Sequence, residues 1–111
     1  MQQVPHIPYV EVPAVPGDAL LLDVREPDEW SAGRVKDSLH VPMGQVPARL
    51  ADIPADRRIV VVCRSGGRSA RVTEFLRQHG YDAVNLNGGL QAWDRAGRSL
   101  VSDNAGVGQL R

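Results

Sequence analysis

The sequence predicts one α/β domain with a mostly parallel central sheet flanked by helices. Short β-rich runs alternate with stretches of helical periodicity along the 111 residues, which is the pattern of strands joined by crossover helices. Two of these runs, 19–24 (ALLLDV) and 58–62 (RIVVV), are apolar enough to be buried on both faces, as central parallel strands are. A chain of this length also has room for one sizeable core, so we expect one domain.

Each remaining element is predicted from a local pattern of apolar residues, glycines and prolines. In chain order we expect a strand at 9–12, a helix at 27–32 stopped by Gly33, a weak strand at 39–41, a short helix at 46–51 with Leu50 facing inward, a helix from near Arg68 to Gly80, a strand at 83–86, and a helix at 90–96 with Leu90 and Trp93 on one face. These elements place the domain at 9–97. Residues 1–8 form a lead, and the small, polar residues 98–111 predict a loosely held tail.

Composition and charge exclude several classes of function. Thirteen Lys and Arg against thirteen Asp and Glu give no net charge, so the chain lacks the basic field expected of a nucleic-acid-binding or polybasic membrane-surface protein. Its apolar runs are far shorter than the roughly 20 residues that cross a bilayer. The amino terminus lacks the basic start and unbroken apolar stretch of a secretory signal. We therefore expect a cytoplasmic protein.

Cys63 is the first candidate for chemistry. It follows the predicted strand at 58–62, at the carboxyl edge where open α/β sheets bind ligands. It is the only cysteine, which excludes an intramolecular disulfide, a thioredoxin-like dithiol mechanism and a thiolate-rich zinc site. The three histidines lie too far apart in the sequence for a local metal motif. We therefore expect neither a metal nor another cofactor.

The loop after Cys63 has the composition of an anion-binding turn. Gly66 and Gly67 allow backbone conformations in which successive N–H groups turn toward the sulfur. The amino terminus of the helix near Arg68 adds unpaired donors and a positive dipole. If Arg64 and Arg68 point inward, they also favour the thiolate, and a pKa depressed by about two units would make it dominant at neutral pH. Two plainer interpretations, an inert core cysteine and a solvated glycine turn, both predict an unreactive Cys63.

Four segments in this order resemble the rhodanese family of sulfurtransferases. They are LLDVREPDEW at 21–30, GRVKDSLHVP at 33–42, CRSGGRS at 63–69 and GYDAVNLNGGLQAW at 80–93. The resemblance implies a single rhodanese-like domain in which Cys63 carries a sulfane sulfur as a persulfide. It also implies a substrate-binding loop made of Arg64, Ser65, Gly66, Gly67, Arg68 and Ser69. The implied partners are a small anionic donor such as thiosulfate and an acceptor that is cyanide, a thiol or a protein.

Asp23 and Arg25 also match the family, and we interpret them as structural. Asp23 ends a buried strand, and Arg25 is expected to pair with Glu26 or Glu29.

The sequence departs from the family pattern in two places. Arg34 stands where the family commonly has histidine, and Asp-Ser at 37–38 replaces the usual Gly-Ala. The short link from residue 12 to residue 19 leaves little room for the helix that many members carry there. These departures concern the scaffold more than the loop at Cys63.

Two other functions compete with sulfur transfer. A cysteine phosphatase or arsenate reductase also uses a thiolate in a backbone cradle, but its signature needs an arginine where this chain has Ser69. Arg68 lies one residue too early to match it. The second competitor is a regulatory or partner-docking rhodanese-like module, against which the retained Cys63 argues. Transfer to cyanide and transfer to a protein thiol are both compatible with the sequence.

Overall fold

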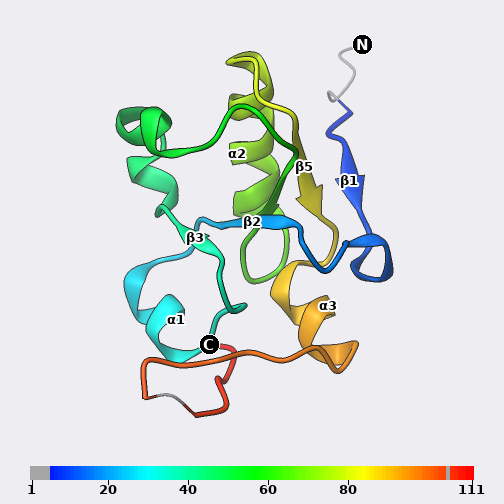
Figure 1. Cartoon of the computed structure of the whole chain (residues 1–111), viewed down its shortest axis with the longest axis vertical. Helices are drawn as coiled ribbons and strands as arrows, with labels where there is room; N and C mark the ends of the chain where they lie inside the picture. Colours follow the sequence, from blue (N-terminus) through cyan, green and yellow to red (C-terminus); the bar gives the residue numbers. More distant parts are fainter. Residues whose placement is uncertain (1–5, 105) are drawn as a thin grey trace.

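The computed structural model describes residues 6–104 and 106–111, and in these ranges five strands form one parallel sheet. The strands are β1 (Tyr9–Val10), β2 (Leu20–Asp23), β3 (Leu39–His40), β4 (Ile59–Val62) and β5 (Ala83–Leu86). Their spatial order is β1-β5-β4-β2-β3, and every neighbouring pair is parallel (Figure 1). The predicted fold class is confirmed, and the β-branched run predicted for the middle of the sheet is the central strand β4.

The described chain also contains three α-helices and three 3-10 segments, which lie between the strands except for the last helix, which follows β5. They are η1 (Val12–Ala14), α1 (Pro27–Ala32), η2 (Met43–Gln45), η3 (Pro47–Asp52), α2 (Gly67–Gln78) and α3 (Gly89–Arg95). The helix predicted at 46–51 is a 3-10 segment at 47–52 with a kink at Arg49, whose dihedral angles are non-helical. The link after residue 12 holds only η1, as its length predicts. No helix within the described ranges is both long enough and apolar enough to cross a membrane.

The core consists of two apolar layers, one on each face of the sheet. Alternate side chains of β4 enter opposite layers, and all four are buried. One layer contains Val61 and Cys63 together with Val72 and Leu76 of α2. The other layer contains Val60, Val62, Val84 and Leu86 together with Leu90 and Trp93 of α3. Asp23 at the end of β2 and Cys63 after β4 lie at the carboxyl edge of the sheet.

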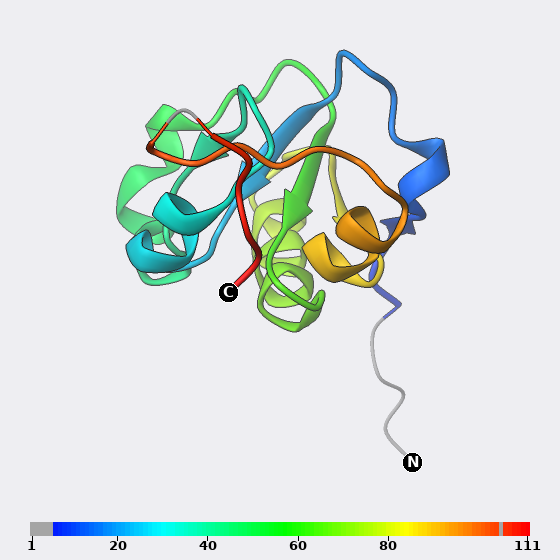
Figure 2. The same cartoon turned by 90° about the horizontal axis from the view of Figure 1, so that it is seen from below.

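The carboxyl-terminal segment 98–111 differs from the loosely held tail that its composition predicts. Its described residues run from α3 to α1 along the domain (Figures 1 and 2). Leu100 is only 4% exposed, and the backbones of Val101 and Arg34 exchange two hydrogen bonds of 2.8 and 2.9 Å. Gln109 donates from its backbone N–H to the Ala32 carbonyl at 2.9 Å. Backbone bonds hold this segment in place, and backbone bonds leave no mark in side-chain composition.

The domain limits 9–97 predicted from the sequence remain a proposal. Residues 1–5 of the predicted lead lie outside the described residues. At the end of the lead, the Pro8 carbonyl accepts a hydrogen bond of 2.9 Å from the Asn85 backbone N–H, which continues the contact of β1 with β5.

Candidate active site

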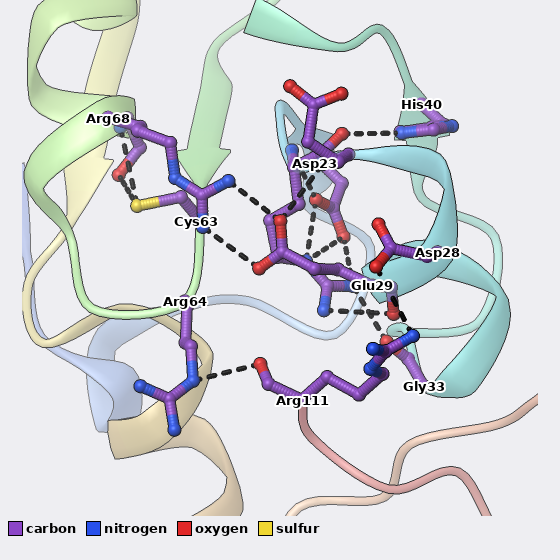
Figure 3. A network of polar contacts seen from close by, with 12 residues as sticks. Asp23, Asp28, Glu29, Gly33, His40, Cys63, Arg64, Arg68 and Arg111 are labelled. Carbon is purple, nitrogen blue, oxygen red and sulfur yellow. Dashed lines mark hydrogen bonds and ion pairs between the residues drawn. The ribbon is translucent and has the colours of Figure 1, made fainter.

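Cys63 lies immediately after β4, at the start of the loop that leads into α2. The residue is 1% exposed, and its sulfur is surrounded by hydrogen-bond donors. The Gly66 N–H donates to Sγ at 3.1 Å, the Ser69 N–H at 3.4 Å, and the Ser69 hydroxyl lies 3.3 Å away. Gly66 has φ +105°, a left-handed conformation that side chains rarely adopt. The loop therefore curls around the sulfur of Cys63 (Figure 3).

These surroundings lower the pKa of the Cys63 thiol. Burial acts in the opposite direction and by itself raises the pKa, because it removes water from the thiolate. Hydrogen bonds from the Ser69 hydroxyl and from the backbone amides of Ser69, Gly66 and Ser65 outweigh the burial. The first turn of α2 begins at Gly67 and points its unpaired amides toward the same region. The arrangement favours a thiolate over a thiol.

Helix α3 and strand β5, which are distant from the loop in sequence, form hydrogen bonds to it. The carbonyl groups of Cys63 and Arg64 accept hydrogen bonds of 2.9 Å from the backbone N–H groups of Leu90 and Gln91, in the first turn of α3. A side chain on Gly89 would place its Cβ 2.6 Å from both carbonyl oxygens, so this close approach requires glycine. On the other side, the Asn85 amide Nδ2 donates to the Gly66 carbonyl at 3.1 Å.

Arg68 is bound to a carboxylate beside the loop. Its guanidinium donates to both oxygens of Glu29 in α1, at 2.7 and 2.9 Å (Figure 3). The side-chain hydrogen bonds from Arg68 lower the pKa of Glu29 from 4.5 to about 2, although partial burial opposes the shift. The same bonds raise the pKa of Arg68 further, to which the charge on Cys63 also contributes. Arg68 therefore brings a permanent positive charge near the sulfur, with part of its donor edge occupied by Glu29.

Arg64 lies at the exposed rim and reaches away from the sulfur. Its Nε donates to the Arg111 carbonyl at 2.8 Å, and the Arg111 guanidinium lies 3.2 Å from the Asp28 carboxylate (Figure 3). Of the six loop residues predicted to bind substrate, Ser65, Gly66 and Ser69 direct donors at Cys63, and Gly67 begins α2. The side chains of the two arginines are engaged elsewhere.

The prediction that Arg25 pairs with the side chain of Glu26 or Glu29 is wrong. Arg25 is fully buried, and its guanidinium binds the Asp23 carboxylate, with Nη2 to Oδ2 at 2.7 Å. Its contact with Glu29 is to the backbone carbonyl, at 3.3 Å, and it also donates to the Gly33 carbonyl at 2.7 Å. The Glu29 carboxylate instead accepts from Arg68 and from the Glu26 backbone N–H, at 3.0 Å for the latter. Arg25 is thus buried between Asp23 and α1, which supports the structural role interpreted for Asp23 and Arg25.

Sequence reasoning did not identify Asn85 or Glu29 as part of the site. Asn85 is a polar residue inside the otherwise apolar strand β5, and its side chain bonds both Gly66 and Ser69. That interruption of an apolar run was the signal available. Glu29 has no such signal, because its partner Arg68 is 39 positions away in the chain.

The fold and the site together define a parallel α/β domain with one cysteine held in a backbone cradle at the end of its central strand. The model of the rhodanese-like domain family matches residues 13–96. A sulfurtransferase of Allochromatium vinosum is 45% identical over 86 residues, which cover 77% of this chain and 80% of that protein. The chain belongs to the rhodanese-like domain family, as the four sequence segments predict.

Solved structures agree with this assignment. A rhodanese-related protein of Thermoplasma volcanium superposes with a TM-score of 0.76 at 30% identity, covering 85% of this chain and 97% of that one. A protein described as a probable thiosulfate sulfurtransferase matches with a TM-score of 0.70 at 27% identity, over 83% of this chain and 46% of that one.

Proposed function

We propose that this protein is a sulfurtransferase that moves a sulfane sulfur through a persulfide on Cys63. The observation that carries the proposal is the set of donors around Sγ, which stabilises a thiolate without a metal or a second cysteine. Relatives named sulfurtransferase support rhodanese-type sulfur transfer in general. The proposed catalytic domain is 9–97, which contains the range matched by the family model.

In the first half-reaction, the Cys63 thiolate attacks the outer sulfur of a small anionic donor such as thiosulfate. The donor S–S bond breaks, sulfite leaves with the bonding electron pair, and Cys63 carries the persulfide anion. The amides of Ser65, Gly66 and Ser69 offset the negative charge in this buried site. A donor of small size fits the 1% exposure of Cys63, and the positive charge of Arg68 favours an anion.

In the second half-reaction, an acceptor nucleophile attacks the outer sulfur of the persulfide. The acceptor is cyanide or a thiolate, including one on a protein. The Sγ–S bond breaks, Cys63 leaves as thiolate, and the acceptor becomes thiocyanate or a persulfide. A lowered pKa makes Cys63 a better leaving group in this step, because the thiol of lower pKa departs faster. A reducing compartment such as the cytoplasm suits a reactive thiol that has no partner cysteine.

The decisive experiment is intact-mass measurement after incubation with thiosulfate. We expect wild-type protein to gain one sulfur atom that cyanide then removes, and Cys63→Ser to gain nothing. Hydrolysis of a phosphate ester is measured in parallel, because a cysteine phosphatase would use the same thiolate. Absence of added sulfur with both thiosulfate and a polysulfide donor would overturn the proposal. Ester hydrolysis would then support a phosphatase, and its absence would support a partner-docking module.

A further inference from the structure

The side chain of Asn85 connects two parts of the loop around Cys63. Asn85 lies in β5, directly beside Val61 of β4, and is 8% exposed. Its Nδ2 donates to the Gly66 carbonyl at 3.1 Å, and its Oδ1 lies 2.6 Å from the Ser69 hydroxyl oxygen. The first bond holds the loop, but the mechanism above does not use the second.

The direction of the second bond follows from the first. The Gly66 carbonyl can only accept, so the amide nitrogen of Asn85 must face it and Oδ1 must face Ser69. Oδ1 carries no hydrogen, so the 2.6 Å contact requires the Ser69 hydroxyl to donate to Asn85. A hydroxyl has one hydrogen. It cannot be given fully to Asn85 and also to Cys63 Sγ at 3.3 Å.

This competition has different consequences for the two forms of Cys63. With the neutral thiol, the Ser69 hydroxyl donates to Asn85 while its oxygen accepts the S–H, so every group is paired. With the thiolate, the hydroxyl either stays on Asn85 and gives the sulfur nothing, or turns to the sulfur and leaves Oδ1 without its bond. Leaving a buried acceptor unpaired is costly. In both cases Asn85 reduces the net stabilisation that the Ser69 hydroxyl gives to the thiolate.

We propose that Asn85 is a positioning residue that competes with Cys63 for the Ser69 hydroxyl hydrogen, weakens the hydrogen bond from this hydroxyl to the sulfur and so keeps the thiolate strongly nucleophilic. For thiols of one type, nucleophilicity falls as the thiolate becomes more stabilised. The backbone amides form the thiolate, and Asn85 limits the additional stabilisation from Ser69. The hydrogen-bond arrangement stands independently of sulfur transfer, whereas its kinetic consequence rests on the proposed function.

The charged groups around the loop are the same whether or not Asn85 is present. Arg68 of α2 is bound to Glu29 of α1, and Arg25 is bound to Asp23 at the end of β2. Strand β5 contributes no ionisable side chain, and the first turn of α3 contains no acidic residue. A change in the titration of Cys63 after substitution of Asn85 therefore comes from the Ser69 hydroxyl or from the lost Nδ2 bond to Gly66, and a Ser69→Ala background separates the two.

The test is a titration of the Cys63 thiolate by its ultraviolet absorbance, with Cys63→Ser subtracted. Asn85→Leu keeps the approximate side-chain volume and removes Oδ1, so the hydroxyl turns to the sulfur. We expect the midpoint to fall by about one pH unit. In a Ser69→Ala background the same substitution should produce a much smaller shift, because no hydroxyl hydrogen is left to redirect and only the loss of the Gly66 bond remains. The exposed Asn87, which binds Glu11 at 2.8 Å, provides the matched control Asn87→Leu with an unchanged midpoint.

The inference is overturned if Asn85→Leu titrates like wild type, or if its shift is as large in the Ser69→Ala background. Asn85→Ala removes the same oxygen without adding bulk and replaces the leucine variant if that variant does not fold. Above both midpoints, persulfide formation from thiosulfate should be about threefold slower in Asn85→Leu than in wild type. If the midpoints shift but wild type forms no persulfide, the proposed function fails while the hydrogen-bond arrangement stands.

Discussion

Two arginine–carboxylate pairs contact α1, and they differ mainly in burial. The side chains of Asp23 and Arg25 are both 0% exposed, whereas those of Glu29 and Arg68 are 15% and 33% exposed. The buried pair, Asp23 and Arg25, joins β2 to α1 through the Glu29 carbonyl and to the C-cap residue Gly33 through its carbonyl. The rim pair joins α1 to α2 beside the sulfur. The inner pair, Asp23 and Arg25, therefore connects parts of the scaffold. The rim pair, Glu29 and Arg68, places charged groups beside the site.

The inner pair, Asp23 and Arg25, is buried, so it is stable only when all of its donors and acceptors are hydrogen-bonded. Removing two charges from water costs several kcal/mol for each ion, so a buried pair is tolerated only when every donor and acceptor is used. Among the described residues, no buried side-chain nitrogen or oxygen lacks a hydrogen-bond partner. The rim pair retains some water and is less costly to break.

The largest expected effect comes from breaking the inner pair. Arg25→Met leaves the Asp23 carboxylate buried and uncompensated, which should reduce the free energy of unfolding by about 3–5 kcal/mol. That is a large part of the 5–15 kcal/mol or so typical of a folded domain. Urea unfolding followed by tryptophan fluorescence measures the change. Arg71→Met, at an exposed position of α2, is the control and should change stability by less than about 0.5 kcal/mol.

Replacing both members of the inner pair sharpens this prediction. Asp23→Leu combined with Arg25→Leu leaves no buried charge and should cost less than Arg25→Met alone. If Arg25→Met were as stable as Arg71→Met, the structural interpretation of the inner pair would be wrong.

A smaller effect is expected at the rim, and it depends on pH. Because Arg68 lowers the pKa of Glu29 from 4.5 to about 2, the pair stabilises the fold above the ordinary pKa of 4.5 and loses that contribution as the pH falls toward 2. Glu29→Gln should therefore cost about 1 kcal/mol near neutral pH, and its difference from wild type should vanish at the acid end. Denaturation at a series of pH values measures this. A difference that stayed constant into acid would contradict the ionic origin.

The smallest effect is expected at the pair between Arg34 and Asp103, which ties the carboxyl-terminal segment to the domain. The hydrogen bond from the Arg34 side chain lowers the pKa of Asp103, but Asp103 lies in solvent. Water and salt screen such a pair. Thermal unfolding of Asp103→Asn should match wild type within error, because the backbone bonds between Val101 and Arg34 remain. A clear loss of stability would mean that side chains, rather than backbone, hold this segment.

The sequence predicts elements best where local patterns, such as an apolar run, a proline or a glycine, mark the limits of the element. The strand at 83–86 and the helix at 27–32 have their predicted limits, because apolar runs and the glycine at 33 mark them directly. The glycine pair after Cys63 likewise indicates the loop that surrounds the sulfur.

Partners across the fold are predicted less well. Arg68 and Glu29 meet only because the fold brings the start of α2 within side-chain reach of α1, and the choice of Asp23 for Arg25 depends on which way a side chain turns. The packing of 98–111 depends on backbone bonds, which side-chain patterns do not encode. What sequence patterns predict is therefore local shape and burial, and what they miss is the pairing between separate elements.

The contact of α3 with the loop determines which way the loop is polarised. In a trans peptide the carbonyl oxygen and the following amide hydrogen point in opposite directions. Because the Cys63 and Arg64 carbonyls turn toward Leu90 and Gln91, the next amide hydrogens turn away from α3, and that of Ser65 is among the donors to the sulfur. If a side chain at Gly89 rotated these peptides, oxygen atoms would face the sulfur and the loop would repel anions. The preference of the site for negative charge is thus set in part by a glycine that never touches the anion.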